Sequence, residues 1–354
     1  MKIKLAIVDN DERYLGRIST AFNQKYADKL RVYSFTNVEA LQQTMTETRF
    51  DVVLVSEYFE IDTKQLPEWV GFAYLVDSAD IDTLNNQQTV CKFQKIDLIY
   101  KQILSIFAEN TNSIIGTKGT ETNCKMIAVC SPSGGSGVTS ISAAIALRLA
   151  AEGHKTLYLN LESLGASETF FSGEGQFDMS DVIFALKSKR TNLGMKLESC
   201  VRQDRRGVYF FAAPKLALDM TELKAEEILR LITDILLTGS YEYIVADFDF
   251  NMTEDFLNLL SRFHAILLTG TGSEISNCKI FRLYNSLVVR EETNGMHLME
   301  RMSLIYNKFS NKTGKIISDI ELKNIGGIPR FEHATDTQVI EQIARMAVLD
   351  KIIP

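Results

Sequence analysis

The chain has 354 residues, of which 45% are hydrophobic and 23% charged, and its formal net charge is −7 at pH 7. These values suit a globular protein of two or three domains, and the acidic balance argues against a generally basic nucleic-acid-binding surface. The five scattered cysteines include no C-x-x-C pair, which argues against a zinc site or a disulfide scaffold and favours a reducing cytoplasm. The first ten residues turn acidic, so no signal peptide is expected, and no apolar run reaches the ~18 residues of a membrane span.

The first half of the chain alternates apolar runs with segments of helical spacing. The apolar runs, each of strand length, are KLAIVD (4–9), RVYSF (31–35), FDVVLVS (50–56), GFAYLV (71–76) and the short CKFQ (91–94). The segments with helical spacing are RYLGRISTAFNQKY (13–26), NVEALQQTM (37–45) and DLIYKQILSIF (97–107). This alternation predicts a parallel sheet with helices on both faces.

A polar segment, residues 108–123, is rich in Thr, Asn and Gly, so we interpret it as a linker. The second half then restarts the alternation. Its apolar runs are KMIAVCS (125–131), KTLYLNLE (155–162), GVYFFAA (207–213), YEYIVADF (241–248), HAILLTG (264–270) and MSLIYN (302–307). Its helical segments are SISAAIALRLAAEG (140–153), AEEILRLITDILLTG (225–239) and SEISNCKIFRLYNSLVV (273–289). We therefore predict an α/β protein with two doubly wound parallel-sheet domains, residues 1–107 and 124–354.

The stretch SPSGGSGVTSIS, residues 131–142, is similar to a phosphate-binding loop without its lysine. The usual motif is G-x-x-x-x-G-K-[ST], and here Val138 stands where the Lys belongs and Thr139 follows it. An apolar strand precedes the stretch and a helix of small residues follows it, a setting in which backbone N–H groups and a helix N-terminus hold phosphate oxygens. The predicted nucleotide-binding residues of this loop are Ser133, Gly134, Gly135, Ser136, Gly137, Val138, Thr139 and Ser140.

Three further positions complete the predicted nucleotide site. Asp247 ends the apolar part of YEYIVADF and, together with Thr139, is the predicted Mg²⁺ position. Asn307 ends MSLIYN and is predicted to pair with the edge of an adenine, and Pro329 lies in the loop GGIPRFE that would border the base. The alternatives are that Asp247 only ends a strand and that Asn307 only forms a turn.

The first half resembles a two-component receiver domain over residues 1–107. That resemblance implies an acidic pair after the first strand, a phosphate-accepting Asp after the third and a Lys after the fifth. These positions fall on Asp9 and Asn10, on Ser56 and on Lys95. Because a Ser hydroxyl is a poor nucleophile and no anionic ligand for Mg²⁺, we predict that this half accepts no phosphoryl group and serves as an interaction domain.

The order of features in the second half resembles the MinD/ParA family of deviant Walker ATPases, whose loop reads K-G-G-x-G-K-[ST]. The two lysines correspond to Ser133 and Val138, and the family's D-x-D after the next strand corresponds to Asn160 and Glu162. The resemblance implies ATP and Mg²⁺ as ligands and a dimer. Since Asn160 and Glu162 are the hydrolysis-linked positions, and since one is neutral and both lysines are missing, we predict weak ATP hydrolysis or none.

A receiver-like half followed by a MinD-like half resembles the TadZ/CpaE proteins of tight-adherence (Flp-type) pilus assembly. This resemblance implies a cytoplasmic homodimer that binds assembly proteins of a pilus or secretion machine, with a cell pole as its expected place. The amphipathic segment 337–353 has few cations, so we expect it to pack on its own domain and membrane contact to be weak or indirect. The alternatives are a partition-type ATPase acting on DNA or membrane, disfavoured by the acidic charge, and an atypical response regulator, disfavoured by Ser56.

Overall fold

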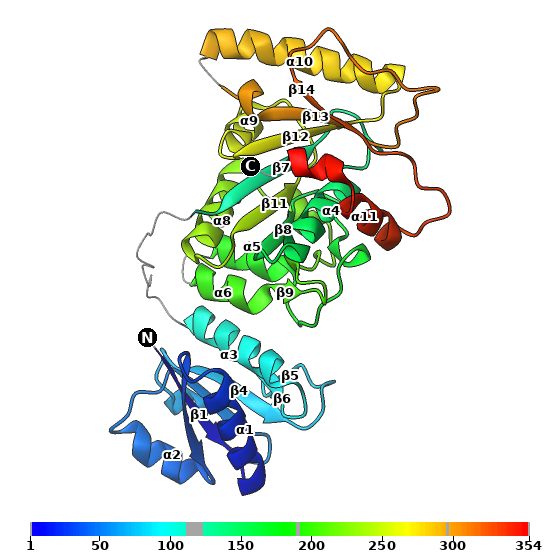
Figure 1. Cartoon of the computed structure of the whole chain (residues 1–354). Coiled ribbons are helices and arrows are strands. Elements are labelled where there is room, and N and C mark those ends of the chain that lie inside the picture. Colours follow the sequence, from blue (N-terminus) through cyan, green and yellow to red (C-terminus); the bar gives the residue numbers. More distant parts are fainter. Residues whose placement is uncertain (1, 111–122, 189–191, 295–296, 353–354) are drawn as a thin grey trace. The chain divides into compact units, whose positions relative to one another are not determined.

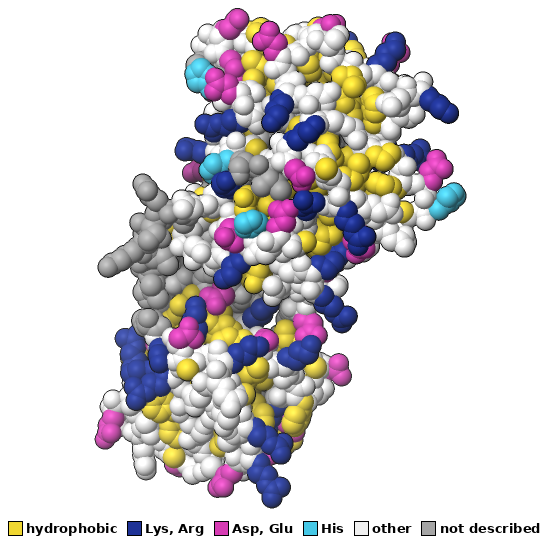
Figure 2. Space-filling model, viewed as in Figure 1, with side chains coloured by type: hydrophobic (Ala, Val, Ile, Leu, Met, Phe, Trp, Pro, Cys, Tyr) yellow, Lys and Arg dark blue, Asp and Glu magenta, His cyan; other side chains and the backbone are white. Residues whose placement is uncertain are grey.

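The computed structural model describes four stretches of the chain, residues 2–110, 123–188, 192–294 and 297–352 (Figure 1). On the face shown in Figure 2, basic and acidic side chains lie interspersed over the surface. None of the helices in the four described stretches is long and apolar enough to cross a membrane. The predicted linker, residues 108–123, lies for the most part outside the described residues.

The chain forms two compact units. The first unit combines Met1–Gly116 with Phe184–Cys200, and the second combines Thr117–Ile183 with Val201–Pro354. The first unit thus includes Phe184–Cys200, a segment that the sequence prediction placed in the second domain. The predicted division into residues 1–107 and 124–354 is kept as a proposal.

The first unit contains a six-stranded sheet with the order β2-β1-β3-β4-β6-β5. Its strands are β1 (Ile3–Val8), β2 (Leu30–Phe35), β3 (Val52–Ser56), β4 (Gly71–Val76), β5 (Thr83–Leu84) and β6 (Gln87–Cys91). Its helices are α1 (Glu12–Lys25), α2 (Val38–Met45), the 3₁₀ helix η1 (Thr63–Gln65), α3 (Ile96–Asn110) and α6 (Leu193–Cys200). All neighbouring strands are parallel except β5 and β6, which confirms the predicted parallel sheet.

Helices cover both faces of this sheet. Leu54 on β3 packs on one face with Ile18 of α1 and Ile103 of α3. The next residue, Val55, packs on the other face with Leu41 of α2. Successive strand residues point to opposite faces, so one fully apolar strand supplies both cores.

The predicted run CKFQ (91–94) is not a strand. The strand β6 ends at Cys91 and pairs with β4, with Thr89 opposite Tyr74 and Cys91 opposite Val76. Its first residues are polar, so hydrophobicity does not mark where the strand begins. Because β6 ends at Cys91, the residue that directly follows it is Lys92.

The second unit contains an eight-stranded sheet with the order β14-β13-β12-β7-β11-β8-β10-β9. Its strands are β7 (Lys125–Cys130), β8 (Thr156–Asn160), β9 (Arg202–Gln203), β10 (Tyr209–Phe210), β11 (Tyr243–Asp247), β12 (Ala265–Gly270), β13 (Met302–Tyr306) and β14 (Lys323–Gly327). Only β9 is antiparallel to its neighbour. The strand predicted over 207–213 is thus limited to Tyr209–Phe210.

The helices of this part of the chain are α4 (Val138–Ala151), α5 (Met179–Lys187), α7 (Leu218–Thr221), α8 (Ala225–Leu237), α9 (Glu254–Leu260), α10 (Glu274–Asn294) and α11 (Asp336–Ala344). Short 3₁₀ helices are η2 (Ser167–Thr169), η3 (Met299–Arg301) and η4 (Ala347–Lys351). The central strand β7 lies between β12 and β11, with β13 beyond β12 and β8 beyond β11. This is a switch point of the strand order, and ligands of open α/β sheets bind outside the carboxyl ends of the strands there.

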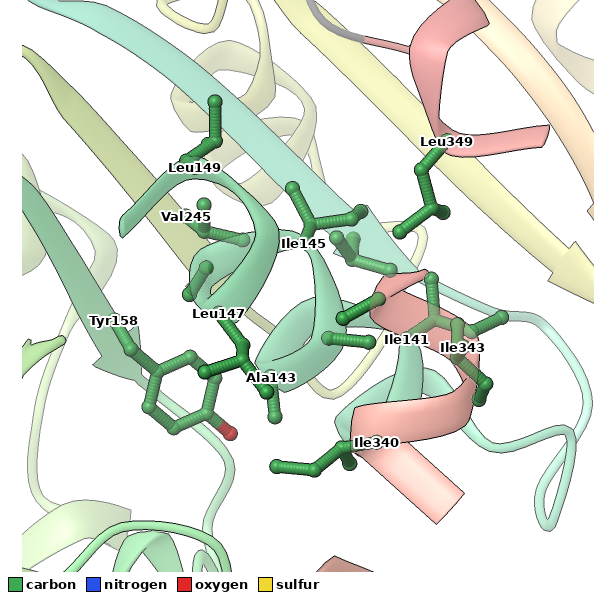
Figure 3. Packing of buried hydrophobic residues seen from close by; sticks show 14 of the residues in the cluster. Ile141, Ala143, Ile145, Leu147, Leu149, Tyr158, Val245, Ile340, Ile343 and Leu349 are labelled. Carbon is green, nitrogen blue, oxygen red and sulfur yellow. The ribbon is translucent and has the colours of Figure 1, made fainter. Parts of the chain in front are cut away.

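The helix α4 is buried in the core of the second unit, as Figure 3 shows. Its side chains Ile141 and Ile145 are buried together with Ile340 and Ile343 of α11 and Leu349 of η4. This packing confirms that the amphipathic segment near the C-terminus packs on its own domain. Because close-packed interiors leave little freedom of movement, the core holds α4 and therefore its N-terminus in place.

Candidate functional site

The glycine-rich loop joins the end of β7 to the start of α4. Gly135 and Gly137 have φ angles of 72° and 84°, in the left-handed region that favours glycine. A Cβ atom on Gly137 would lie 2.1 Å from Nδ2 of Asn307, whereas a Cβ on Gly134 would meet nothing within 4 Å. Gly137 is the N-cap of α4, which begins at Val138. The glycines therefore let the backbone turn directly into a helix N-terminus, the arrangement that holds phosphate oxygens.

Hydroxyl groups attach the loop to the neighbouring strand β12. Ser131 Oγ donates to the carbonyl of Thr269 at 2.6 Å, and Ser136 Oγ lies 2.7 Å from Thr269 Oγ1. The N–H of Ser133 donates to Ser131 Oγ at 3.0 Å. Ser133 is only 7% exposed, so the first of the two missing-lysine positions is a buried part of the loop.

The second missing-lysine position is occupied by an apolar side chain. Val138 packs against the hydrophobic core of the second unit. Ser140, on the first turn of α4, is half-buried. The loop from residue 133 to residue 140 therefore supplies backbone N–H groups and hydroxyls but no cation.

Asp247 is the buried carboxylate beside this loop. It ends β11 and lies opposite Val129 of β7 and Asn160 of β8 in the sheet register. The Tyr158 hydroxyl donates to its Oδ2 at 2.8 Å. Within the described residues its Oδ1 is buried and has no hydrogen-bond partner. Because an unpartnered buried oxygen is unfavourable, this atom is suited to bind a proton or a cation.

A second carboxylate, Glu162, lies close to the hydroxyl that was predicted to bind Mg²⁺. Thr139 Oγ1 is 3.1 Å from each of its two carboxylate oxygens. Burial raises the pKa of Asp247 to about 8, and the charge of Glu162 adds to that effect. Burial likewise raises the pKa of Glu162. Burial is thus the main cause of both shifts, because it disfavours the charged form of a carboxyl group.

These groups fit a Mg²⁺ ion, which prefers hard oxygen ligands and keeps several waters. The unpartnered Oδ1 of Asp247 and the hydroxyl of Thr139 are the atoms that would face it. Among the residues that the structure describes, no group of three or more His, Cys, Asp or Glu side chains could hold a metal ion. Phosphate oxygens and water would therefore have to complete the coordination.

Asn160 stands where the resemblance places a water-positioning acid. Its Nδ2 donates to the Tyr158 hydroxyl at 3.1 Å and lies 3.4 Å from Glu162 Oε2. Its Oδ1 accepts the N–H of Glu162 at 3.0 Å. Asn160 therefore positions its neighbours, and a neutral amide cannot take a proton from water.

Asn307 lies on the other side of the loop and is 4% exposed. Its Nδ2 donates to the carbonyl of Ser136 at 2.9 Å, and its Oδ1 accepts the N–H of Lys308 at 2.9 Å. The structure thus gives Asn307 a bracing contact with the loop, while its pairing with adenine stays a prediction. Pro329 is exposed in the segment after β14, and its place beside the base also stays a prediction.

The receiver-like pocket of the first unit is built around one buried ammonium group. Lys92 Nζ lies 2.8 Å from Asp9 Oδ2, 3.1 Å from Asp77 Oδ1 and 3.1 Å from Ser56 Oγ. Asp9 and Ser56 are fully buried and Lys92 is 7% exposed. Burial lowers the pKa of Lys92, but the carboxylates of Asp9 and Asp77 outweigh that effect and raise the pKa above its usual value. The ammonium therefore stays charged and holds the pocket together.

The lysine of this pocket is Lys92, so the prediction of Lys95 is corrected. The reason is the end of β6 at Cys91, which puts Lys92 directly after the strand. Lys95 instead lies at the start of α3, where its carbonyl accepts the N–H of Leu98. The predicted acidic pair is also divided, because Asp9 is buried in the pocket whereas Asn10 is exposed.

Replacing Lys92 with Met is expected to lower the free energy of unfolding of the first unit by about 3 kcal/mol, because Asp9 would keep a buried charge without its partner. The chain has a single Trp, Trp69, which lies in this unit and is 48% exposed. Its fluorescence during denaturant unfolding measures the loss. Lys64→Met, an exposed position of the same unit, is the matched control, and an equal loss in both variants would contradict the assignment of Lys92.

Comparisons with known proteins agree with both halves of this description. The family model "TadZ-like, receiver domain" matches residues 1–108. A ParA family ATPase from Chlorobium tepidum TLS is similar with 20% identity and a TM-score of 0.51, covering 65% of this chain and 96% of that chain. The MinC:MinD cell division protein complex of Aquifex aeolicus is similar with 19% identity and a TM-score of 0.49, covering 65% and 98%. A search of curated proteins finds no match.

The molecule is thus an α/β protein in which a receiver domain is combined with a unit that has the fold of a ParA family ATPase. Residues 1–108 form a TadZ-like receiver domain. The chain therefore combines, in this order, the receiver-like half and the half with the ParA-like fold that its sequence predicts.

Three residues of the two sites were missed from the sequence. Lys92 directly follows a strand whose end was misplaced. Tyr158 lies two positions before Asn160 on β8, and strand alternation puts the two side chains on one face. Lys308 follows Asn307, and its Nζ lies 3.0 Å from the carbonyl of Gly135. The correct end of β6 would have indicated Lys92, and the alternation of side chains along β8 would have indicated Tyr158.

Proposed function

We propose that this protein binds ATP with Mg²⁺ and acts as a localisation and assembly factor for a tight-adherence (Flp-type) pilus or secretion machine. The observation that carries the proposal is the glycine loop at the N-terminus of α4 beside the unpartnered Oδ1 of Asp247. The N–H groups of the loop would bind the phosphates, and Thr139 and Asp247 would hold Mg²⁺. The TadZ-like receiver domain supports the link to pilus assembly.

In this proposal ATP is mainly a ligand that stabilises a homodimer, and its hydrolysis is weak or absent. Bound Mg²⁺ would neutralise charge on the phosphates and on Asp247. The receiver-like unit, in which the Lys92 ammonium contacts Asp9 and Ser56, would bind assembly proteins without being phosphorylated. The proposed place of action is the cytoplasm, concentrated at a cell pole, with indirect or weak membrane contact.

Sedimentation velocity is expected to show a shift from monomer toward dimer when ATP and Mg²⁺ are added, and no shift when EDTA accompanies the ATP. The reason is mass action, because a ligand that binds the dimer more tightly than the monomer raises the dimer population. Calorimetry on the same samples measures the binding itself. Unchanged sedimentation together with no detectable heat of ATP binding would contradict the proposal.

The second candidate function is a partition-type ATPase that acts on DNA, and the ParA-like fold of the second unit is the observation that favours it. The net charge of −7 argues against it. Binding to DNA that weakens steeply with salt would support this candidate, because displaced counterions make such binding salt-dependent. A response regulator would instead form an acid-labile adduct with acetyl phosphate, which a Ser at residue 56 disfavours.

A further inference from the structure

Two consecutive residues after β13 hold two consecutive carbonyl groups of the glycine loop. Asn307 Nδ2 donates to the carbonyl of Ser136 at 2.9 Å, and Lys308 Nζ donates to the carbonyl of Gly135 at 3.0 Å. The side chain of Lys308 also passes Gly137, where a Cβ would lie 4.0 Å from its Cε. The lysine therefore lies along the loop and contributes a contact that no residue within the loop makes.

The contacts to these two carbonyls also determine where two N–H groups point. In a trans peptide the C=O and the following N–H point in opposite directions, and the structure has no cis peptide among the described residues. Fixing the carbonyl of Gly135 orients the N–H of Ser136, and fixing the carbonyl of Ser136 orients the N–H of Gly137. Both N–H groups are thereby turned away from the Asn307 amide and the Lys308 ammonium.

The backbone of Lys308 is itself held in an uncommon conformation. Its φ angle is 54°, a left-handed value that is unfavourable for a residue with a Cβ. The Oδ1 of Asn307 accepts the N–H of Lys308 at 2.9 Å, which supports this turn. The turn is what directs the Lys308 side chain back over the loop.

We propose that Lys308 is a positioning residue of the phosphate loop, whose ammonium holds the Gly135 carbonyl and so arranges the loop backbone for phosphate. This inference rests on the proposed nucleotide site for its ligand. The lysine acts through the loop and from its carbonyl side. It is therefore assigned the shaping of the binding site and no contact with the reacting phosphate.

The experiment compares Lys308→Met, which keeps the aliphatic stem, with Lys308→Arg, which keeps a cationic donor. Lys312→Met, an exposed position on the same connection, is the matched control. Backbone ¹⁵N relaxation of the nucleotide-free protein is expected to give order parameters near ~0.85 for Gly135, Ser136 and Gly137 in the wild type and the control. In Lys308→Met these values are expected to fall toward ~0.6, and Lys308→Arg is expected to restore them.

Calorimetry with ATP·Mg²⁺ is expected to give about tenfold weaker binding for Lys308→Met and nearly unchanged binding for Lys308→Arg and Lys312→Met, the factor that one hydrogen bond of ordinary net strength supplies. Unchanged order parameters in Lys308→Met, or a loss that Arg does not restore, would overturn the assignment. If the wild type binds no nucleotide while the loop of Lys308→Met still loosens, the proposed function fails and the positioning role stands.

Discussion

Replacing Gly137 with Val is expected to abolish nucleotide binding, whereas Val138→Ala is expected to leave it largely intact. Gly137 has a φ angle of 84°, and a Cβ there would lie 2.1 Å from Nδ2 of Asn307. The new side chain would therefore force both a strained backbone and the loss of the contact that holds the Ser136 carbonyl. Val138 packs against the core and has no charge to lose, so its truncation removes only apolar contact.

Calorimetry with ATP·Mg²⁺ measures both variants, and circular dichroism shows whether each keeps its fold. Gly134→Ala is the matched control, because a Cβ at that position would meet nothing within 4 Å. Gly135→Val is expected to behave like Gly137→Val, since its φ angle is 72°. Equal losses in Gly137→Val, Val138→Ala and Gly134→Ala would mean that the loop does not bind phosphate through its backbone.

A steady-state assay is expected to give a kcat below ~1 s⁻¹ for ATP hydrolysis, the low end of ordinary enzyme values. Phosphoryl transfer depends on cations that face the developing charge and on a positioned water. Neither position of the missing lysines carries a cation, because Val138 is apolar and packs on the core and Ser133 is buried. The side-chain amide of Asn160 is neutral and donates a hydrogen bond to the Tyr158 hydroxyl. The loss of one such cation can lower the rate by ~10³–10⁵, as arginine fingers show.

The assay needs protein freed of contaminating ATPases, and Asp247→Ala serves as the control for the site. Activity that survives in Asp247→Ala belongs to a contaminant. A kcat at or above ~1 s⁻¹ that Asp247→Ala abolishes would refute the prediction. In that case a cation outside the loop would have to reach the phosphates.

The parallel sheets were predictable because strands buried on both faces leave long apolar runs in the sequence. The bounds of β6 were not predictable, because its first three residues, Gln87, Gln88 and Thr89, are polar and the apolar signal begins only at Val90, one residue before the strand ends. One misplaced strand end was enough to move the pocket lysine from Lys92 to Lys95. Strand ends depend on pairing with β4, which hydrophobicity does not record.

The proposed nucleotide site likewise combines features that are local in the sequence with contacts that are not. The loop and Asp247 were predictable, because a glycine-rich turn and an acidic strand end are local patterns. The contacts of Tyr158 with Asp247 and of Lys308 with Gly135 join residues far apart in the chain. Only the order of the strands brings those residues together.

Because α11 is buried against α4, it cannot support α4 and insert into a lipid surface at the same time. Its apolar side chains Ile340 and Ile343 are fully buried in the core that also contains Ile141 and Ile145 of α4. To insert into a lipid surface they would first have to leave that core, at roughly 1.5–3 kcal/mol for each side chain. Their departure would also loosen α4, whose N-terminus directly follows the glycine-rich loop. We therefore expect insertion of α11 into lipid to compete with the binding of ATP. When ATP is bound, we expect the protein to reach a bilayer only indirectly, through a partner protein that itself binds the membrane.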